Sequence, residues 1–286
     1  MTFLEAIILG VVQGATEFLP ISSSGHLVLG QYLLGLDEPQ LLFDIVLHVG
    51  TLLAVIGFYR RDLGAIGEGL RGRALSPLGR RPISEALEPQ GARLALLIVI
   101  ASVPTAILGI VVDEYLPVER GTRLSALFVC GALLVNGFIL FAGRFARDLE
   151  PDEREGVATL WNIAPWVALV IGIAQGAAVI PGLSRSGLTI ISALFLGVWR
   201  DQAARYSFLM SVPAILGALV LKFEPSAFSG AALSTNAPIF LLGALSAGLV
   251  GYGAIILLVK LIERAQFHHF SWYCWAIGAA GLFQLL

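Results

Sequence analysis

A polar break, Gln13-Gly-Ala-Thr-Glu-Phe-Leu-Pro-Ile-Ser-Ser-Ser-Gly-His26, interrupts the first apolar region of the chain, residues 3–36. A second break, Gln175-Gly-Ala-Ala-Val-Ile-Pro-Gly-Leu-Ser-Arg-Ser-Gly-Leu-Thr189, interrupts the apolar region 163–198 in a similar way. Each half of these regions is shorter than the roughly 20 apolar residues that a helix needs to cross a bilayer. Broken backbone at membrane depth is tolerated beside protein or a water-filled cavity. We therefore predict two re-entrant helix pairs, with a kinked full span in each region as the alternative.

The composition of the whole chain indicates an all-α integral membrane protein. Hydrophobic residues make up 57% of the 286 residues and charged residues only 13%, whereas soluble domains carry about 25% charged residues. The formal net charge of −2, with no basic stripe on any segment, gives no support for nucleic-acid binding. Cys130 and Cys274 lie in separate apolar runs, and we interpret them as small buried hydrophobes rather than a disulfide.

Six further segments are apolar and long enough, or nearly so, to cross the membrane as helices. They are residues 41–59, 92–112, 124–145, 206–221, 238–261 and 270–286. Together with the two re-entrant pairs they make ten predicted helices in a single membrane domain, 1–286. The basic segment 60–91, which also contains Gly and Pro, is predicted to be a cytoplasmic loop that could include some interfacial helix.

The distribution of Lys and Arg predicts the orientation in the membrane. Four connections would lie on one side and contain 14 of these residues: 60–93, 144–162, 200–205 and 260–269. The two on the other side, 113–123 and 222–237, contain 3. The first side is therefore predicted to be cytoplasmic, which places the C-terminus outside. The first re-entrant pair then enters from outside and the second from the cytoplasm.

The two breaks align without gaps at an offset of 162 residues, and seven of the sixteen positions from Gly10 and Gly172 onward are identical. Three predicted spans lie between the breaks, so the second copy is expected to be inverted. Repeat one covers about 1–146 and repeat two about 160–286. Inverted repeats with broken helices place a binding site near mid-membrane at the repeat interface. We therefore expect the tips of the two breaks to face each other.

The positions at which the two copies differ carry the expected chemistry. Glu17 aligns with Val179, Ser23 with Arg185, and His26 with Leu188. A carboxylate inside a membrane is costly and indicates a functional site. Gln13 and Glu17 share one helical face, so their oxygen atoms could together hold a divalent cation, Mg²⁺ or Ca²⁺. The alternative is that Glu17 only forms a buried ion pair with Arg185.

Both breaks end in a serine-rich helix start, where free N–H groups and the helix dipole favour anions. Serine also caps such helices, and capping is the preferred interpretation for Ser22 and Ser184. Arg185 strengthens the anion prediction, because a guanidinium binds phosphate through two parallel hydrogen bonds. The predicted substrate-binding residues are Gln13, Ser22, Ser24, Gly25, Ser184, Ser186, Gly187 and Thr189.

His26 follows Ser23 by about one helical turn. A serine with a neighbouring histidine is the minimal arrangement for an activated nucleophile, and histidine can move protons in either direction near neutral pH. Asp44 and His48 are weaker candidates, which could line the cavity or simply cap and pack. A phosphate-binding guanidinium, a hydroxyl, an imidazole and a cation suit phosphoryl transfer, and the bilayer location indicates a substrate with a long apolar tail.

The first break resembles the first motif of the bacitracin-resistance type undecaprenyl-diphosphate phosphatases, and Pro181-Gly-Leu-Ser-Arg-Ser-Gly-Leu-Thr189 resembles their second. The resemblance also covers the chain length, the hydropathy profile, the basic loop and the segment Tyr206-Ser-Phe-Leu-Met-Ser-Val-Pro213. The family's first motif begins with Glu or Gln. This chain has Gln13, which leaves Glu17 as the main metal ligand.

The resemblance implies a cation-dependent enzyme of the bacterial plasma (inner) membrane, with its active site facing the outer side. Its reaction would convert undecaprenyl diphosphate to undecaprenyl phosphate and inorganic phosphate. This recycles the carrier lipid for cell-wall synthesis and confers resistance to bacitracin, which acts on the lipid rather than on the protein. The catalytic residues by matching position are Glu17, Ser23, His26 and Arg185. Ser23 is the preferred nucleophile, with His26 or a water molecule as alternatives.

Two other functions remain compatible with these residues. A secondary transporter or lipid flippase could use the same inverted repeat, and a non-catalytic protein could bind the lipid diphosphate and sequester it. Release of phosphate distinguishes an enzyme from both. The sequence leaves open whether the protein forms a homodimer.

Overall fold

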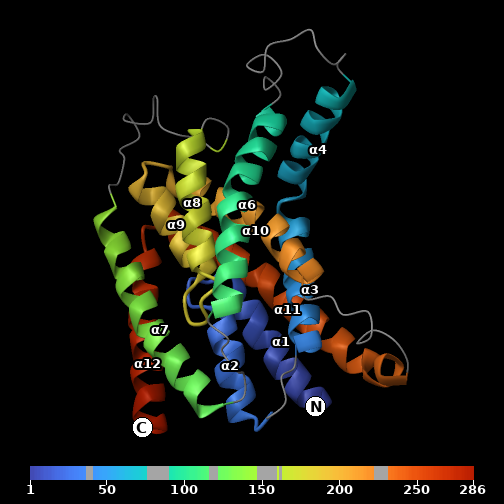
Figure 1. The fold of residues 1–286 in the computed structure, drawn as a ribbon, viewed down its shortest axis with the longest axis vertical. Helices are drawn as coiled ribbons and strands as arrows, with labels where there is room; N and C mark the ends of the chain where they lie inside the picture. The colour runs from blue at the N-terminus through green and yellow to red at the C-terminus, as the bar shows by residue number, and fades with distance from the viewer. Residues whose placement is uncertain (37–40, 76–89, 116–121, 147–159, 161–162, 222–230) are drawn as a thin grey trace.

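The computed structural model describes residues 1–36, 41–75, 90–115, 122–146, 160, 163–221 and 231–286, and its regular elements there are helices (Figure 1). They are α1 (Phe3–Phe18), α2 (Ser23–Leu33), α3 (Leu41–Phe58), α4 (Arg60–Leu75), α6 (Gln90–Tyr115), α7 (Arg123–Ala142), α8 (Pro165–Ala177), α9 (Arg185–Phe195), α10 (Arg200–Leu221), α11 (Ala231–Glu263) and α12 (Phe270–Leu285). Short 3₁₀ turns follow α7, at Gly143–Phe145, and precede α12, at Phe267–His269.

Helices occupy all six predicted spans and both predicted re-entrant pairs. Among the described residues, four helices are long and apolar enough to cross a membrane by themselves: α6, α7, α10 and α11. The α3–α4 pair, bent by 78° at its junction, would raise this number to five. Helix α12 has 16 residues, and α8 and α9 are shorter still. The protein is therefore an all-helical membrane protein with four or five candidate spans.

The segment 60–91, predicted as a cytoplasmic loop that could include some interfacial helix, contains the helix α4 over residues 60–75. Residues 76–89 of that loop lie outside the described part of the chain. Asp62 in the first turn of α4 forms an ion pair with Arg205 of α10, and Gly69 packs closely on Gly91 at the start of α6. Contacts between distant segments, rather than an apolar period in the sequence, stabilise α4, which explains why the pattern did not reveal it.

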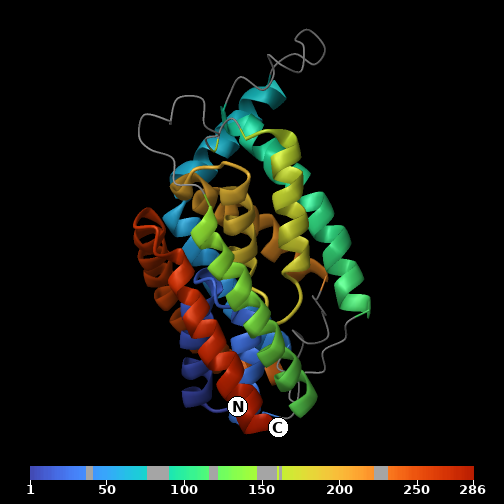
Figure 2. The same ribbon diagram turned by 90° about the vertical axis from the view of Figure 1, so that its left-hand side faces the viewer.

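The two broken helix pairs approach the middle of the molecule from opposite ends. In Figures 1 and 2, α1 and α2 extend from the end that carries both termini, whereas α8 and α9 extend from the other end. Their helices keep the offset of 162 residues: α1 begins at Phe3 and α8 at Pro165, and α2 begins at Ser23 and α9 at Arg185. The breaks therefore meet at mid-height.

Glycines at matching positions perform the same packing role in both pairs. A Cβ atom at Gly10 would lie 2.5 Å from the carbonyl oxygen of Gly243 in α11, and one at Gly172 would lie 2.2 Å from that of Ala101 in α6. Small residues permit such close approach of helices in membranes. The first short helix of each pair thus packs against a long helix from the other half of the sequence.

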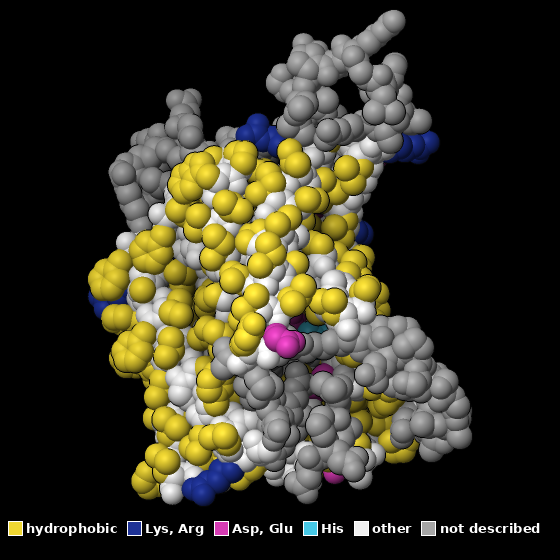
Figure 3. All heavy atoms as spheres, in the orientation of Figure 1, with side chains coloured by type: hydrophobic (Ala, Val, Ile, Leu, Met, Phe, Trp, Pro, Cys, Tyr) yellow, Lys and Arg dark blue, Asp and Glu magenta, His cyan; other side chains and the backbone are white. Residues whose placement is uncertain are grey.

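The outer surface is dominated by apolar side chains. They are spread over the described part of the face seen in Figure 3, and the basic side chains on this face appear around its margin. Val99 and Ile107 on α6 are more than half exposed, and so is Leu249 on α11. Such a surface suits contact with lipid tails, whereas Gln13, Glu17 and Asn136, described below, are buried between the helices.

Candidate active site

The tips of the two breaks are in direct contact, as the inverted arrangement predicts. The backbone N–H of Gly182 in the second break donates to Ser22 Oγ in the first at 3.1 Å. Ser186 Oγ donates to the carbonyl of Leu19 at 3.3 Å. Gly182 has φ +97, and a Cβ atom there would lie 2.5 Å from the side chain of Ala132 on α7. A glycine is therefore needed at Gly182 both for backbone conformation and for space.

Asn136, in the middle of α7, holds both breaks at once. Its Nδ2 donates to the carbonyl of Pro20 at 2.9 Å, and its Oδ1 accepts from the backbone N–H of Ser184 at 3.0 Å. The side chain is fully buried. Asn136 was not among the residues predicted from the sequence. An amide side chain inside an otherwise apolar predicted span was the signal that could have indicated it.

Replacing Asn136 with leucine is expected to lower the free energy of unfolding by about 2–4 kcal/mol, because it leaves a buried N–H and a buried carbonyl without partners. Thermal or denaturant unfolding in detergent measures this. Ser211→Ala is the matched control, since Ser211 is equally buried and donates to Phe208 of its own helix. If Asn136→Leu unfolds like the wild type, Asn136 does not hold the breaks together.

Glu17 lies at the centre of the site and receives side chains from four helices. Its Oε2 accepts hydrogen bonds from Gln13 Nε2 at 3.0 Å and from Ser23 Oγ at 2.5 Å. Its Oε1 accepts from Arg185 Nη2 of the opposite break at 2.5 Å. His48 Nε2 on α3 is 3.8 Å from Oε2. The carboxylate is buried, and three of the four predicted catalytic residues meet here.

The predicted serine caps are confirmed at the start of both α2 and α9. Ser22 Oγ accepts from the N–H of Gly25 at 3.3 Å, and Ser184 Oγ accepts from the N–H of Gly187 at 3.1 Å. The same serine cap therefore starts both helices, although the backbone at the cap differs, with φ 69 at Ser22 and φ −92 at Ser184. Ser22 does more than cap, because it also accepts the hydrogen bond from Gly182.

The remaining predicted hydroxyls bind the framework rather than Glu17. Ser24 Oγ lies 3.4 Å from Ser22 Oγ, and Ser186 Oγ lies 3.1 Å from Ser184 Oγ. Thr189 Oγ1 donates to the carbonyl of Arg185 at 2.8 Å and is 2.6 Å from Ser207 Oγ of α10. These contacts fix the helix starts, whereas Ser23 is the hydroxyl that reaches the carboxylate.

His26 is held away from Ser23 by two other contacts. Its Nδ1 is 2.8 Å from the carbonyl of Ser22, and its Nε2 is 2.9 Å from the hydroxyl of Tyr273 on α12. The His26 and Tyr273 rings are stacked with centroids 5.6 Å apart. In this arrangement the Ser23 hydroxyl donates its hydrogen bond to Glu17 rather than to His26. Tyr273 is far away in sequence, and no local pattern indicated its contact with the site.

The two weaker candidates lie close to the site on α3. His48 reaches the edge of the Glu17 cluster, with its Nδ1 2.7 Å from the carbonyl of Asp44. Asp44 accepts a hydrogen bond from Gln31 Nε2 of α2 at 2.8 Å. His48 is thus near enough to interact with a ligand at Glu17, whereas Asp44 helps to pack α2 against α3.

Two polar atoms beside Glu17 are buried and have no hydrogen-bond partner within the described structure: Gln13 Oε1 and Arg185 Nη1. Leaving such atoms unpaired costs about 1–3 kcal/mol each, and more for charged groups. Gln13 Oε1 is an acceptor that suits a cation, and Arg185 Nη1 is a donor that suits an anion. A salt bridge with Glu17 alone leaves both unsatisfied.

The residues present fit a hard divalent cation that a ligand helps to hold. The described residues contain no group of three or more His, Cys, Asp or Glu side chains placed to bind a metal. Glu17 and Gln13 supply oxygen atoms, which Mg²⁺ and Ca²⁺ prefer, and Mg²⁺ is commonly bound by one or two carboxylates together with substrate phosphates and water. The donor set therefore suits a cation that arrives with a phosphorylated ligand.

Comparisons with known proteins extend over nearly the whole chain. The profile of the family described as "Bacitracin resistance protein BacA" matches residues 6–280. The protein named undecaprenyl-diphosphatase from Desulforapulum autotrophicum is 42% identical over 281 residues, which cover 97% of this chain and 96% of that protein. A protein of the same name from Rubrobacter xylanophilus is 41% identical over 286 residues, covering 98% and 97%. This chain therefore belongs to the bacitracin resistance protein BacA family.

Proposed function

We propose that this protein hydrolyses undecaprenyl diphosphate to undecaprenyl phosphate and inorganic phosphate in the bacterial plasma membrane. The names of its relatives support undecaprenyl diphosphate as the substrate. The observation that carries the proposal is the pair of unpaired buried atoms beside Glu17, an acceptor on Gln13 and a donor on Arg185. A lipid diphosphate with a divalent cation supplies both missing partners. Loss of the diphosphate removes the lipid on which bacitracin acts.

Arg185 and the starts of α2 and α9 would bind the terminal phosphate. Helix starts carry N–H groups that lack intrahelical partners and favour anions. Gln13 and Glu17 would hold Mg²⁺ or Ca²⁺ against the phosphate oxygens. The cation, when bound, neutralises the negative charge of the diphosphate and stabilises the leaving phosphate.

Ser23 is placed to attack the terminal phosphorus. Its proton passes to Glu17, 2.5 Å away, as the bond from Oγ to phosphorus forms and the bridging P–O bond breaks. The lipid monophosphate leaves with the electron pair of that bond. Water then attacks the phosphoserine, releasing inorganic phosphate and giving one proton to Ser23 to restore its hydroxyl, and Glu17 releases the proton that it took to the solvent. Arg185 stabilises the charge on the transferred group throughout.

The direct test is phosphate release from a polyprenyl diphosphate by the purified protein in detergent, with Mg²⁺ or Ca²⁺ present. We expect multiple turnovers with either long-chain substrate or shorter analogues. If the folded protein binds the lipid but releases no phosphate at any cation concentration, it is a transporter, flippase or sequestering protein instead.

Ser23→Ala is expected to lower kcat for this reaction by about 10²–10⁴-fold, because the nucleophile and its proton are both lost. Rapid quenching of the wild type should yield a phosphopeptide that contains Ser23. The control is Ser102→Ala, which removes a hydroxyl bonded to Ile98 within α6 and should retain wild-type activity. A Ser23→Ala enzyme that keeps a tenth or more of wild-type kcat would point to attack by water.

We also propose six spans and two re-entrant pairs arranged as an inverted repeat, with the site opening to the outer side. Support comes from the shared helix starts at an offset of 162 residues and from the opposite directions of the pairs in Figure 1. The reciprocal packing of α1 on α11 and of α8 on α6 agrees. The termini would then lie outside, on the side poor in Lys and Arg.

Cysteines placed at the two ends of α6 test this orientation. Gln90 and Tyr115 are both exposed, so each would react in an unsealed membrane. In intact cells, a membrane-impermeant maleimide should label Tyr115→Cys and leave Gln90→Cys unlabelled until the cells are opened. The reverse labelling pattern would contradict the orientation, and equal labelling of both in intact cells would contradict α6 as a span.

A further inference from the structure

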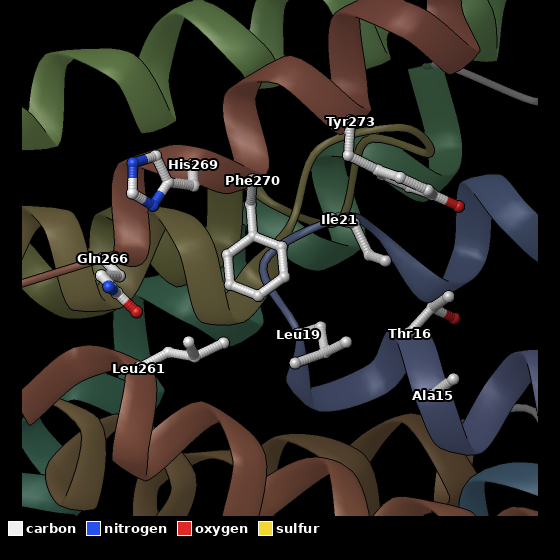
Figure 4. A pocket seen from close by; sticks show the side chains of 9 residues that line it. All are labelled: Ala15, Thr16, Leu19, Ile21, Leu261, Gln266, His269, Phe270 and Tyr273. Atoms are coloured by element: carbon white, nitrogen blue, oxygen red, sulfur yellow. The ribbon is translucent and has the colours of Figure 1, made fainter. Parts of the chain in front are cut away.

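A pocket of about 400 Å³ lies between the first break and the helices of the C-terminal region. Its walls come from α1, the turn after it, the end of α11 and the start of α12 (Figure 4). The apolar side chains among them are Ala15, Leu19, Ile21, Leu261 and Phe270, with the ring of Tyr273 at one end. In Figure 4 the Phe270 ring lies between Leu19 and Leu261, at the centre of the pocket.

We propose that this pocket binds the first isoprenoid units of the polyprenyl diphosphate, next to its phosphates. The proposal rests on the function proposed above and adds the place where the lipid tail lies. The volume is within the roughly 300–1,000 Å³ of pockets that enclose small ligands. It therefore holds the proximal part of the tail, and the remainder extends into the bilayer.

Tyr273 joins the pocket to the catalytic cluster. Its ring lines the pocket, and its hydroxyl is 2.9 Å from Nε2 of His26, which follows Ser23 by three residues. Leu19 and Ile21 line the pocket from the same turn that separates Glu17 from Ser23. Because the first isoprenoid unit is bonded directly to the diphosphate, a phosphate at Glu17 and Arg185 places that unit at this wall.

We favour a diphosphate-linked tail over an ordinary acyl chain because its phosphates would tether the tail next to the pocket. In a bilayer, lipid tails already surround the protein with apolar groups, so an apolar pocket by itself gives little preference for one chain over another. A tail whose phosphates are held by Arg185 has a high effective concentration at the adjacent pocket. Occupancy of the pocket should therefore depend on the diphosphate.

Photocrosslinking of the purified protein tests the location. The probe is a polyprenyl diphosphate with a diazirine on its first isoprenoid unit, and labelled peptides are identified by mass spectrometry. We expect labels on Leu261, Phe270, Tyr273 and residues 19–21, reduced at least tenfold by excess unlabelled diphosphate. The same probe without phosphates should label these positions at least tenfold less. Labels spread over exposed apolar positions such as Val99 and Val103, or equal labelling by the phosphate-free probe, would overturn the proposal.

Leu261→Trp tests the same site by filling it, and Leu257→Trp is the matched control one turn away on α11, outside the pocket. Leu261→Trp should raise KM for the long-chain substrate about tenfold, the effect of losing one large apolar contact. The KM of a single-unit (C5) prenyl diphosphate should rise by a similar factor, because its one unit would lie in the same pocket, and Leu257→Trp should behave as wild type. Equal effects of the two tryptophans would overturn the proposal.

These results separate the tail site from the enzymatic function. If the wild type releases phosphate and the crosslinks fall elsewhere, the tail site is wrong and the function stands. If the crosslinks fall in the pocket, depend on the diphosphate and no phosphate is released, the tail site stands and the function is wrong.

Discussion

Arg185→Ala is expected to lower kcat/KM for phosphate release by about 10³-fold or more, the range seen when a guanidinium that stabilises a transferred phosphoryl group is removed. The structure gives the reason. One nitrogen of the Arg185 guanidinium donates to Glu17 across the interface of the breaks, and another is buried without a partner. That second nitrogen is the donor that a phosphate would occupy. Steady-state phosphate release with long-chain substrate measures the loss.

Two further variants show whether the effect belongs to the guanidinium. Arg185→Lys keeps the charge but replaces the planar fork of N–H donors with a compact ammonium of different geometry, so it should recover less than a tenth of wild-type activity. Arg123→Ala removes an arginine that donates to the carbonyl of Leu285, far from Glu17, and should retain activity. Wild-type kinetics in Arg185→Ala would exclude Arg185 from the reaction.

Glu17→Gln is expected to lower kcat by about 10²–10⁴-fold, because it removes the proton acceptor for Ser23 without changing the shape of the side chain. It should also raise the cation concentration needed for half-maximal activity, since a charged oxygen ligand becomes neutral. Glu5→Gln is the matched control on the same helix, where Glu5 only accepts the Thr2 N–H in the capping box. Phosphate release over a range of Mg²⁺ or Ca²⁺ concentrations measures both effects.

A role of Glu17 in stability can be separated from its role in catalysis. Glu17→Gln leaves the Arg185 charge buried without its partner, which costs about 3–5 kcal/mol when a buried pair is broken. The double variant Glu17→Gln/Arg185→Ala removes both charges and should regain stability while staying inactive. If the double variant is both stable and active, the pair is structural and the site lies elsewhere.

The sequence predicted which segments are helical better than it predicted how many of these helices are candidate membrane spans. All six apolar segments and both broken pairs are helical, because apolar length and serine caps are local properties of the chain. Helix α4 lies in a segment predicted as a loop that could include some interfacial helix, and its bounds could not be predicted because its contacts with α6 and α10 involve residues distant in sequence. Three-dimensional contacts of this kind leave no periodic signal.

The residues of the site likewise divide into those that the sequence could predict and those that it could not. Glu17, Ser23 and Arg185 could be predicted because the two breaks align and differ at those positions, and the structure brings them together. Asn136 and Tyr273 escaped prediction, because their partners at the site lie 48 to 247 residues away in sequence. His26 was expected to pair with Ser23, but the carbonyl of Ser22 and the hydroxyl of Tyr273 engage its two ring nitrogens instead.

The central claim is that the two breaks form one site for a lipid diphosphate and its cation. The most direct measurement is the affinity of the purified protein for a non-hydrolysable polyprenyl methylenebisphosphonate, with Mg²⁺ or Ca²⁺ and with a chelator. We expect the cation to tighten binding at least tenfold and Arg185→Ala to weaken it by about 100-fold, as for loss of a buried charge-paired contact. An affinity unchanged by the chelator and by Arg185→Ala would contradict the claim.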